Sequence, residues 1–294
     1  MKLPTLAAAS LALLLGACAS VAPPAPATPA PAMRAPHIDR SHTSQNQDSR
    51  SLFIVLHYTV LDWEKSLKVL TTGGQVSAHY LVRDEPPVSY ALVDENRRAW
   101  HAGASFWAGH QNLNSSSIGI EIVNPGWVDG PAGRVYAPFP QAQIDEVIAL
   151  VRDIQQRHHV RPERIIGHAD IAPGRKQDPG PSFPWKQLAD AGLIPWPDGP
   201  AVLLKTLEHE VAPRDVAWLQ ERLARIGYGV PRSGQMDPAT RDVVATFQMK
   251  YRPRDISGTV DAETAALIEV AATPGLMRVA GTGVAEARPY TSRW

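Results

Sequence analysis

Apolar residues along the first two thirds of the chain follow two periods, one typical of strands and one typical of helices. A continuous apolar run over residues 52–56 predicts a buried strand. Isoleucine recurs at every second position over residues 118–122, which predicts another strand and places Glu121 on the face opposite the isoleucines. Apolar residues three and four apart predict an amphipathic helix over residues 141–158, and residues 165–166 form a further short strand. Interleaved strands and helices predict an α/β domain in which helices face a sheet.

A second, all-helical pattern follows Pro-Asp-Gly-Pro at residues 197–200, which we interpret as a domain boundary. An apolar stripe at helical spacing over residues 216–226 stops at Gly227. Asp-x-x-Thr sequences begin at Asp237 and Asp261, and this is the form of a helix start with aspartate at the N-cap. The pattern predicts a small three-helix domain.

The N-terminal residues have the pattern of a bacterial export signal. Lys2 precedes an apolar stretch that is too short to span a bilayer, and this stretch ends in Leu-Gly-Ala-Cys at Cys18, the only cysteine. The tetrapeptide resembles the lipobox of lipoproteins, in which the cysteine carries lipid after cleavage. An ordinary secretory peptide cut near Cys18 also fits, although a lone cysteine at this place favours lipidation. We expect a lipid-anchored protein of the cell envelope, on the periplasmic face of the outer membrane, because Ala-Ser after the cysteine resembles an outer-membrane sorting signal.

The amino-acid composition indicates the remaining domain boundaries and excludes nucleic acid as a partner. Alanine, proline and small polar residues dominate up to residue 47, so that this segment cannot bury a core and is expected to be a disordered tether. The 294 residues include 29 basic and 29 acidic side chains, which removes the electrostatic case for nucleic acid, and no protein partner is indicated. We predict a signal peptide at residues 1–17 and a tether at 18–47. A catalytic domain at 48–200, a helical domain at 205–273 and a flexible tail at 274–294 follow.

The loop over residues 167–181 concentrates side chains that bind metals. It holds His168, Lys176 and Asp178 among glycines and prolines, which exclude a continuous helix. His57 directly follows the first predicted strand. Two histidines and one carboxylate form a three-ligand set that leaves one tetrahedral position open, as in catalytic zinc sites.

Glu121 and Lys176 complete a hydrolytic site in this interpretation. A carboxylate beside a buried face can have a raised pKa and act as a general base, and a lysine between the two loop ligands can stabilise an oxyanion. Taken singly, each of these residues has an ordinary alternative: a packed histidine, a solvated carboxylate, a surface lysine or a turn-forming aspartate.

Five ordered motifs make a resemblance to a known family specific. They are Leu-His-Tyr-Thr, Ser-Ala-His-Tyr, Ala-Trp-His-Ala-Gly, Ser-Ile-Gly-Ile-Glu and the metal-binding loop, at 56–59, 77–80, 99–103, 117–121 and 167–181. With them the chain resembles zinc-dependent N-acetylmuramoyl-L-alanine amidases related to phage-lysozyme-type amidases and peptidoglycan recognition proteins. The resemblance implies a central mixed β-sheet flanked by helices. The C-terminal unit resembles three-helix peptidoglycan-binding domains.

The resemblance also implies roles for individual residues. The family's zinc ligands fall on His57, His168 and Asp178, its catalytic glutamate on Glu121 and its lysine on Lys176, without a departure from the pattern. It implies one Zn²⁺ per chain and hydrolysis of the amide bond between N-acetylmuramic acid and L-alanine of the stem peptide. The partners implied are peptidoglycan or muropeptides, in cell-wall turnover or recycling.

Further side chains are expected at the edge of the site. His101, Trp107 and Asn124 are expected to border the substrate cleft, because aromatic and amide side chains commonly hold sugars and peptides. His79 is interpreted as mainly structural. The C-terminal unit either binds the wall or only stabilises the enzyme, and a chain that ends near Pro200 is expected to bind cell-wall sacculi less well.

Two other functions stay open from the sequence. A recognition protein of this family would bind peptidoglycan without cutting it, but such a protein would be expected to lack ligands that are present here. A zinc peptidase would cut within the stem, but the chain has no His-Glu-x-x-His sequence. The preference between intact wall and anhydro-muropeptides, the choice of inner or outer membrane and the oligomeric state also stay open.

Overall fold

The computed structural model describes residues 35–131 and 133–281. The predicted signal peptide, the lipidation site at Cys18 and the predicted tail beyond residue 281 lie outside the described residues. A compact unit begins at Asp48. Across the described residues, no helix combines the length and the apolar character needed to cross a membrane.

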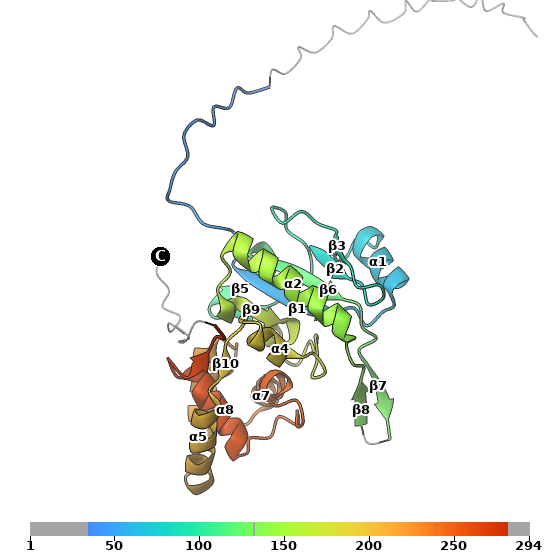
Figure 1. Ribbon diagram of the computed structural model, residues 1–294. Coiled ribbons are helices and arrows are strands. Elements are labelled where there is room, and N and C mark those ends of the chain that lie inside the picture. The colour runs from blue at the N-terminus through green and yellow to red at the C-terminus, as the bar shows by residue number, and fades with distance from the viewer. Residues whose placement is uncertain (1–34, 132, 282–294) are drawn as a thin grey trace, which may run out of the picture. The chain divides into compact units, whose positions relative to one another are not determined.

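A five-stranded mixed sheet, in the order β3-β2-β6-β1-β9, forms the centre of the main domain (Figure 1). Strands β2, β6, β1 and β9 run parallel, and β3 pairs antiparallel with β2 at one edge. The strands are β1 (Phe53–Tyr58), β2 (Tyr80–Val82), β3 (Ser89–Ala91), β6 (Ser117–Ile122) and β9 (Ile165–Gly167). The mixed sheet flanked by helices is confirmed, as are the three predicted strands. Strands β2 and β3 were not predicted, because three residues are too few to display a period.

One face of the sheet is covered by helix α2 (Gln141–His158), whose bounds agree with the prediction (Figure 1). Ile54 and Leu56 of β1 and the isoleucines of β6 pack there with Val147 and Val151 of α2 in one buried cluster. The alternation along β6 therefore points its isoleucines toward α2 and turns Glu121 to the other face, as predicted.

The opposite face of the sheet is covered by C-terminal helices. Phe53, Val55 and Ile166 share a buried cluster with Leu223 and Phe247 of these helices. The helices of this unit are α5 (Gly199–Val211), α6 (Val216–Ile226), α7 (Pro238–Tyr251) and α8 (Ala262–Ala272). The C-terminal unit is thus packed against the sheet, and the two share one apolar core.

Helix α5 was not predicted, because the sequence at its start was interpreted as a boundary. The Asp198 carboxylate accepts a hydrogen bond from the Ala201 amide, and Pro200 lies in the first turn. An aspartate N-cap followed by proline in the first turn favours the start of a helix, so that residues that break one element here begin the next.

The remaining elements are short, and most of them lie in connections. Strands β10 and β11 pair antiparallel and join the end of the main domain to the segment after α8. These elements are α1 (Trp63–Thr72), β4 (Phe106–Trp107), β5 (His110–Gln111), η1 (Leu113–Ser115), β7 (Trp127–Gly130), β8 (Gly133–Tyr136), η2 (Pro162–Arg164), α3 (His168–Ile171), α4 (Trp185–Asp190), β10 (Trp196–Pro197) and β11 (Met277–Arg278).

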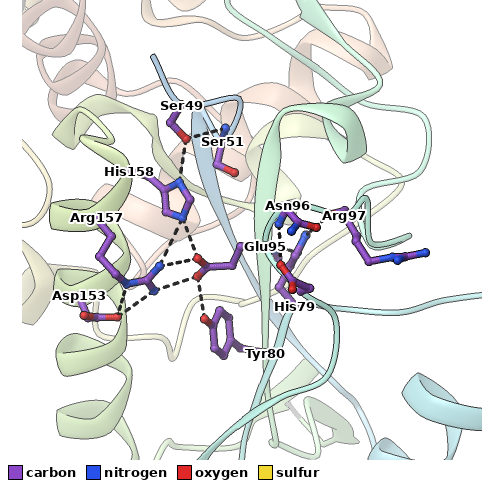
Figure 2. A network of polar contacts seen from close by, with 12 residues as sticks. Ser49, Ser51, His79, Tyr80, Glu95, Asn96, Arg97, Asp153, Arg157 and His158 are labelled. Atoms are coloured by element: carbon purple, nitrogen blue, oxygen red, sulfur yellow. Dashed lines mark hydrogen bonds and ion pairs between the residues drawn. The ribbon is translucent and has the colours of Figure 1, made fainter. Parts of the chain in front are cut away.

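A polar network fastens the end of α2 to the neighbouring strand and loop (Figure 2). Glu95 accepts hydrogen bonds from the guanidinium of Arg157 and from the hydroxyl of Tyr80, and it contacts Nε2 of His158 at 2.8 Å. The other ring nitrogen of His158 is hydrogen-bonded to Ser49 at 2.7 Å. Burial alone would raise the pKa of Glu95, but the three hydrogen bonds together hold it at about 2.

Glu95→Gln is expected to destabilise the fold in a pH-dependent way. Since the folded pKa lies below the ordinary value of 4.5, the contribution to stability is full above pH 4.5 and is lost as the pH falls toward 2. Discounted for partial exposure, it amounts to about 1–2 kcal/mol at neutral pH. Thermal unfolding at a series of pH values should show a gap between wild type and variant that narrows below pH 4.5. Asp153→Asn, which removes a more exposed partner of Arg157, should have a small effect at every pH; a gap independent of pH would contradict the expectation.

Candidate active site

The candidate site lies at the carboxyl ends of the central parallel strands. His57 in β1 and Glu121 in β6 are register partners, so their side chains leave the sheet beside each other on the same face. His168 is the first residue of α3, directly after β9, which is the other neighbour of β1. Ends of adjacent parallel strands meet at one edge of a sheet, and residues distant in sequence are therefore brought together here.

The loop after α3 returns to this edge and delivers the carboxylate. The amide of Ala169 donates a hydrogen bond of 2.8 Å to the carbonyl of Asp178. Nδ1 of His57 and Nδ1 of His168 are 2.9 Å apart, and they lie 3.0 and 2.9 Å from Oδ2 of Asp178. All three side chains are buried, and together they form a group that could hold a metal ion.

Hydrogen bonds on the far side of His57 assign its tautomer. The hydroxyl of Ser117 donates to the carbonyl of Leu113 at 2.6 Å, so the same hydroxyl accepts from Nε2 of His101 at 3.1 Å. Burial holds the pKa of His101 well below its usual value, so the ring is neutral and its Nδ1 is an acceptor. Nε2 of His57 then donates to it at 2.9 Å. Because burial and the adjacent His168 lower the pKa of His57 to about 4, that ring is neutral too, and its Nδ1 presents a lone pair to the group.

The tautomer of His168 follows in the same way. Its Nε2 lies 3.1 Å from the carbonyl oxygen of Ala102 and must donate to it, which leaves Nδ1 as the ring nitrogen that faces the other two side chains. Burial alone would raise the pKa of Asp178, but the adjacent His168 holds it well below its usual range, so the third ligand is a carboxylate. Two ring nitrogens and a carboxylate oxygen this close together need a cation among them, either a proton or a metal ion.

The donor set fits a zinc ion. Ligand atoms bound tetrahedrally at the usual zinc distances lie about 3.3 Å from one another, a few tenths of an ångström more than the separations found here. A metal-binding histidine typically has a hydrogen-bond partner on the ring nitrogen that faces away from the metal. His57 and His168 each have such a partner on Nε2.

Glu121 lies beside the three ligands, and the cation of Lys176 is near enough to act electrostatically on both His57 and Glu121. Oε1 of Glu121 is 4.0 Å from Nδ1 of His57, and among the described residues its Oε2 is buried without a hydrogen-bond partner. Burial raises the pKa of Glu121 well above its ordinary value, and the Asp178 carboxylate raises it further, whereas the cation of Lys176 opposes the shift. A carboxylate with an unsatisfied oxygen next to a metal group is suited to accept a proton.

The structure buries the three side chains that are predicted to contact substrate. His101 is buried behind His57, with both ring nitrogens bonded within the protein. Trp107 is 6% exposed and packs edge-on against Tyr228 of the C-terminal unit. Asn124 is 2% exposed, and its amide group bonds to two backbone groups. The geometry offers little free surface of these side chains to a substrate, because each is occupied in packing or in internal hydrogen bonds.

Ser117 and Gly119 were missed as contributors to the site. A Cβ on Gly119 would lie 2.4 Å from the ring of His101, so only glycine admits the ring at this position. The signal was present in the period-two pattern of β6, because Ser117, Gly119 and Glu121 share one face. His79 accepts from the Gly119 amide and donates to a backbone carbonyl, which agrees with its structural interpretation.

Comparisons with known proteins agree with this geometry. Residues 47–181 match the family model of N-acetylmuramoyl-L-alanine amidase, and residues 213–268 match that of a putative peptidoglycan binding domain. N-acetylmuramoyl-L-alanine amidase AmiD of Escherichia coli (strain K12) is 46% identical over 226 residues, which cover 74% of this chain and 80% of that protein. The 1,6-anhydro-N-acetylmuramyl-L-alanine amidase AmpD of Enterobacter cloacae is 38% identical over 114 residues, 38% of this chain and 55% of that protein.

Solved structures give the same assignment. The complex of E. coli AmiD with the substrate anhydro-N-acetylmuramic acid-L-Ala-D-gamma-Glu-L-Lys has a TM-score of 0.72 at 43% identity and covers 79% of this chain and 92% of that one. AmpDh3 from Pseudomonas aeruginosa in complex with anhydromuramic pentapeptide has a TM-score of 0.74 at 37% identity, with coverages of 81% and 97%. On the strength of the AmiD match, which extends over most of both chains, this protein belongs to the N-acetylmuramoyl-L-alanine amidase family.

Proposed function

We propose that this protein hydrolyses the amide bond between N-acetylmuramic acid and L-alanine of the peptidoglycan stem peptide. The observation that carries the proposal is the convergence of Nδ1 of His57, Nδ1 of His168 and a carboxylate oxygen of Asp178 on one point, with Glu121 beside them. The bound muropeptides in the AmiD and AmpDh3 structures support the substrate class. Cell-wall turnover or recycling is the process that such a reaction serves.

Zn²⁺ is the metal that we assign to His57, His168 and Asp178, one ion per chain. Zinc supplies Lewis-acid chemistry when bound, which lowers the pKa of water and polarises a carbonyl oxygen. The assignment is supported by the two imidazoles and one carboxylate, a set common to catalytic zinc sites. Ser117 and His101 hold the ring of His57 in the tautomer that zinc requires.

The remaining side chains move protons and stabilise charge. Glu121 takes a proton from the water that attacks the lactyl carbonyl, and it returns that proton to the leaving nitrogen of L-alanine. Lys176, between the two loop ligands, provides a positive charge for the oxyanion that develops on the carbonyl oxygen. The positive charge of Lys176 acts on the site, since this charge lowers the pKa of both His57 and Glu121.

Metal removal combined with product analysis tests the function. Chelation of the purified protein is expected to abolish release of products from muropeptides and sacculi, and added Zn²⁺ is expected to restore it. Mass spectrometry should find a free lactyl carboxyl group on the sugar and a new amine on L-alanine. Cleavage within the stem would indicate a peptidase instead, and binding without any release would indicate a recognition protein.

We also propose that the enzyme is attached to the cell envelope at two points. A lipid on Cys18 would tether it to a membrane, in our view at the periplasmic face of the outer membrane, and the helical unit would bind peptidoglycan. The family match of residues 213–268 supports the second attachment. Both contacts would raise the local concentration of substrate.

Cys18→Ser is expected to move the protein from the membrane fraction to the soluble fraction while its activity on soluble muropeptides stays unchanged. The reason is that lipidation requires this thiol. Fractionation of cells followed by immunoblotting measures the change. Membrane association that survives the substitution would contradict the lipid anchor.

A further inference from the structure

The C-terminal helices cover the same face of the sheet that carries the metal group. His57 shares this face with Phe53 and Val55, because all three occupy odd positions of β1. Phe53 and Val55 pack with Leu223 and Phe247 of the helical unit, and all four side chains are buried. The helical unit therefore reaches the neighbourhood of the metal ligands from inside the core.

A buried carboxylate joins the helical unit to the turn that presents His168. Asp170 is 3% exposed, and its Oδ1 accepts a hydrogen bond of 2.7 Å from the hydroxyl of Tyr228. Its Oδ2 accepts from the amide of Gly167 at 2.8 Å and pairs with Nζ of Lys250 at 3.5 Å. Two of the four groups in this network thus belong to the C-terminal unit.

One of the proposed metal ligands, His168, lies in the sequence between two members of this network. His168 lies between Gly167, whose amide is bonded, and Asp170, whose carboxylate accepts that bond. A shift of the carboxylate would move the first turn of α3 and with it the ring of His168. Nζ of Lys250 also lies 4.2 Å from the ring centre of Trp185, so the cation has a fixed place in the core.

The loop that carries Asp178 also approaches the helical unit closely. A Cβ on Gly174 would lie 2.3 Å from a carboxylate oxygen of Asp242 in α7. The backbone of Gly174 has a φ of +75°, which L side chains rarely adopt. The segment between His168 and Asp178 therefore lies close against the C-terminal unit at two places.

We propose that Tyr228 and Lys250 are positioning residues for the metal centre, and that they act through Asp170 on the turn that presents His168. The helical unit then has a role in the chemistry that is separate from any binding to the wall. The inference rests on the proposed metal site. It assigns to the unit a contribution that would be measurable in solution, without peptidoglycan.

Tyr228→Phe and Lys250→Met in the full chain test the proposal. Each keeps the apolar volume of the side chain and removes one partner of Asp170. Groups bonded directly to a metal ligand typically contribute 10–100-fold to metal affinity or activity. Tyr228 and Lys250 act one step further out, through Asp170, so we expect a loss of Zn²⁺ affinity at the lower end of this range, about tenfold, for either variant. Competition with a chelating dye measures the affinity. On a soluble muropeptide, kcat should fall while KM is unchanged, because Tyr228 and Lys250 are only 2% and 8% exposed.

Tyr251→Phe is the matched control. Its ring packs in the same region against Phe247 and Trp196, but within the described segments no hydrogen bond joins its hydroxyl to Asp170. Its Zn²⁺ affinity should equal that of the wild type. If Tyr228→Phe and Lys250→Met bind Zn²⁺ as tightly as Tyr251→Phe, the proposal is overturned, even where unfolding temperatures drop.

The readouts separate this proposal from the proposed function. A wild-type protein that binds Zn²⁺ but cuts no amide would overturn the function, whereas an affinity loss in the two variants would still support the positioning role. A wild type that hydrolyses muropeptides, with variants unchanged in affinity and kcat, would support the function and overturn the positioning role.

Discussion

Glu121→Gln is expected to lower kcat by about 10²–10⁴-fold while the protein keeps one zinc ion per chain. Glutamine has the shape of glutamate but cannot accept a proton at neutral pH, so the attacking water would lose its base. Glu121 is not one of the three converging ligands; its Oε1 lies 4.0 Å from the nearest ligand nitrogen. Metal content should therefore survive the substitution. Steady-state kinetics on a soluble muropeptide and elemental analysis of the same preparation measure both quantities.

A glutamate outside the site provides the control for this substitution. Glu146 of α2 accepts a hydrogen bond from the hydroxyl of Ser89, and Glu146→Gln should leave kcat unchanged. Full activity of Glu121→Gln would remove Glu121 from the mechanism. Loss of zinc together with activity would instead make Glu121 part of the metal-binding set.

The periodicity of the sequence predicted which residues face which side, but not which residues meet. Alternation in β6 fixed Glu121 on the face away from the isoleucines, since the period of a strand is two. That Glu121 lies beside His57 depends on the order and register of the strands, which pairs β6 with β1. Nothing within either segment encodes that pairing; the family resemblance implied only that Glu121 and His57 belong to the same site.

The burial of His101, Trp107 and Asn124 could not be predicted for a related reason. His101 and Asn124 lie in irregular segments, and Trp107 lies in the two-residue strand β4, so no period tells a buried side chain from an exposed one at these positions. Ligand-type and aromatic residues in loops suggest substrate contacts, yet here each side chain is used inside the protein. For Trp107 the deciding partner is Tyr228, more than a hundred residues later, in a unit that the sequence presents as separate.

The most far-reaching difference concerns that separation. Pro-Asp-Gly-Pro at residues 197–200 has the composition of a linker, and the helical pattern beyond it is complete in itself. In the structure both faces of the sheet are covered, and the second face is covered by helices that follow Pro-Asp-Gly-Pro in the chain. A sheet of parallel strands needs both faces covered, and the second face had no other helix assigned to it in the sequence.

A chain limited to residues 48–198 is accordingly expected to have no cooperative unfolding transition. It would lose the C-terminal half of the buried cluster and expose the sheet and loop side chains Phe53, Val55, Ile166 and Ile171. Each fully buried side chain of this size contributes about 1.5–3 kcal/mol, or about 6–12 kcal/mol for the four. Entire domains are stable by only about 5–15 kcal/mol. The loss is therefore comparable to the whole stability, and Asp170 would also lose its partners Tyr228 and Lys250.

Circular dichroism during heating measures the transition, and a chain of residues 48–294 is the matched control. That chain lacks the same N-terminal residues 1–47 but keeps every member of both large buried clusters, so it should unfold at the wild-type temperature. Cooperative unfolding of 48–198 at that temperature would show that the helical unit is dispensable for the fold. If instead 48–198 is unfolded, its weaker binding to sacculi says nothing about wall recognition. That question then requires surface substitutions on α5 to α8 in the intact chain, because only these leave the shared core in place.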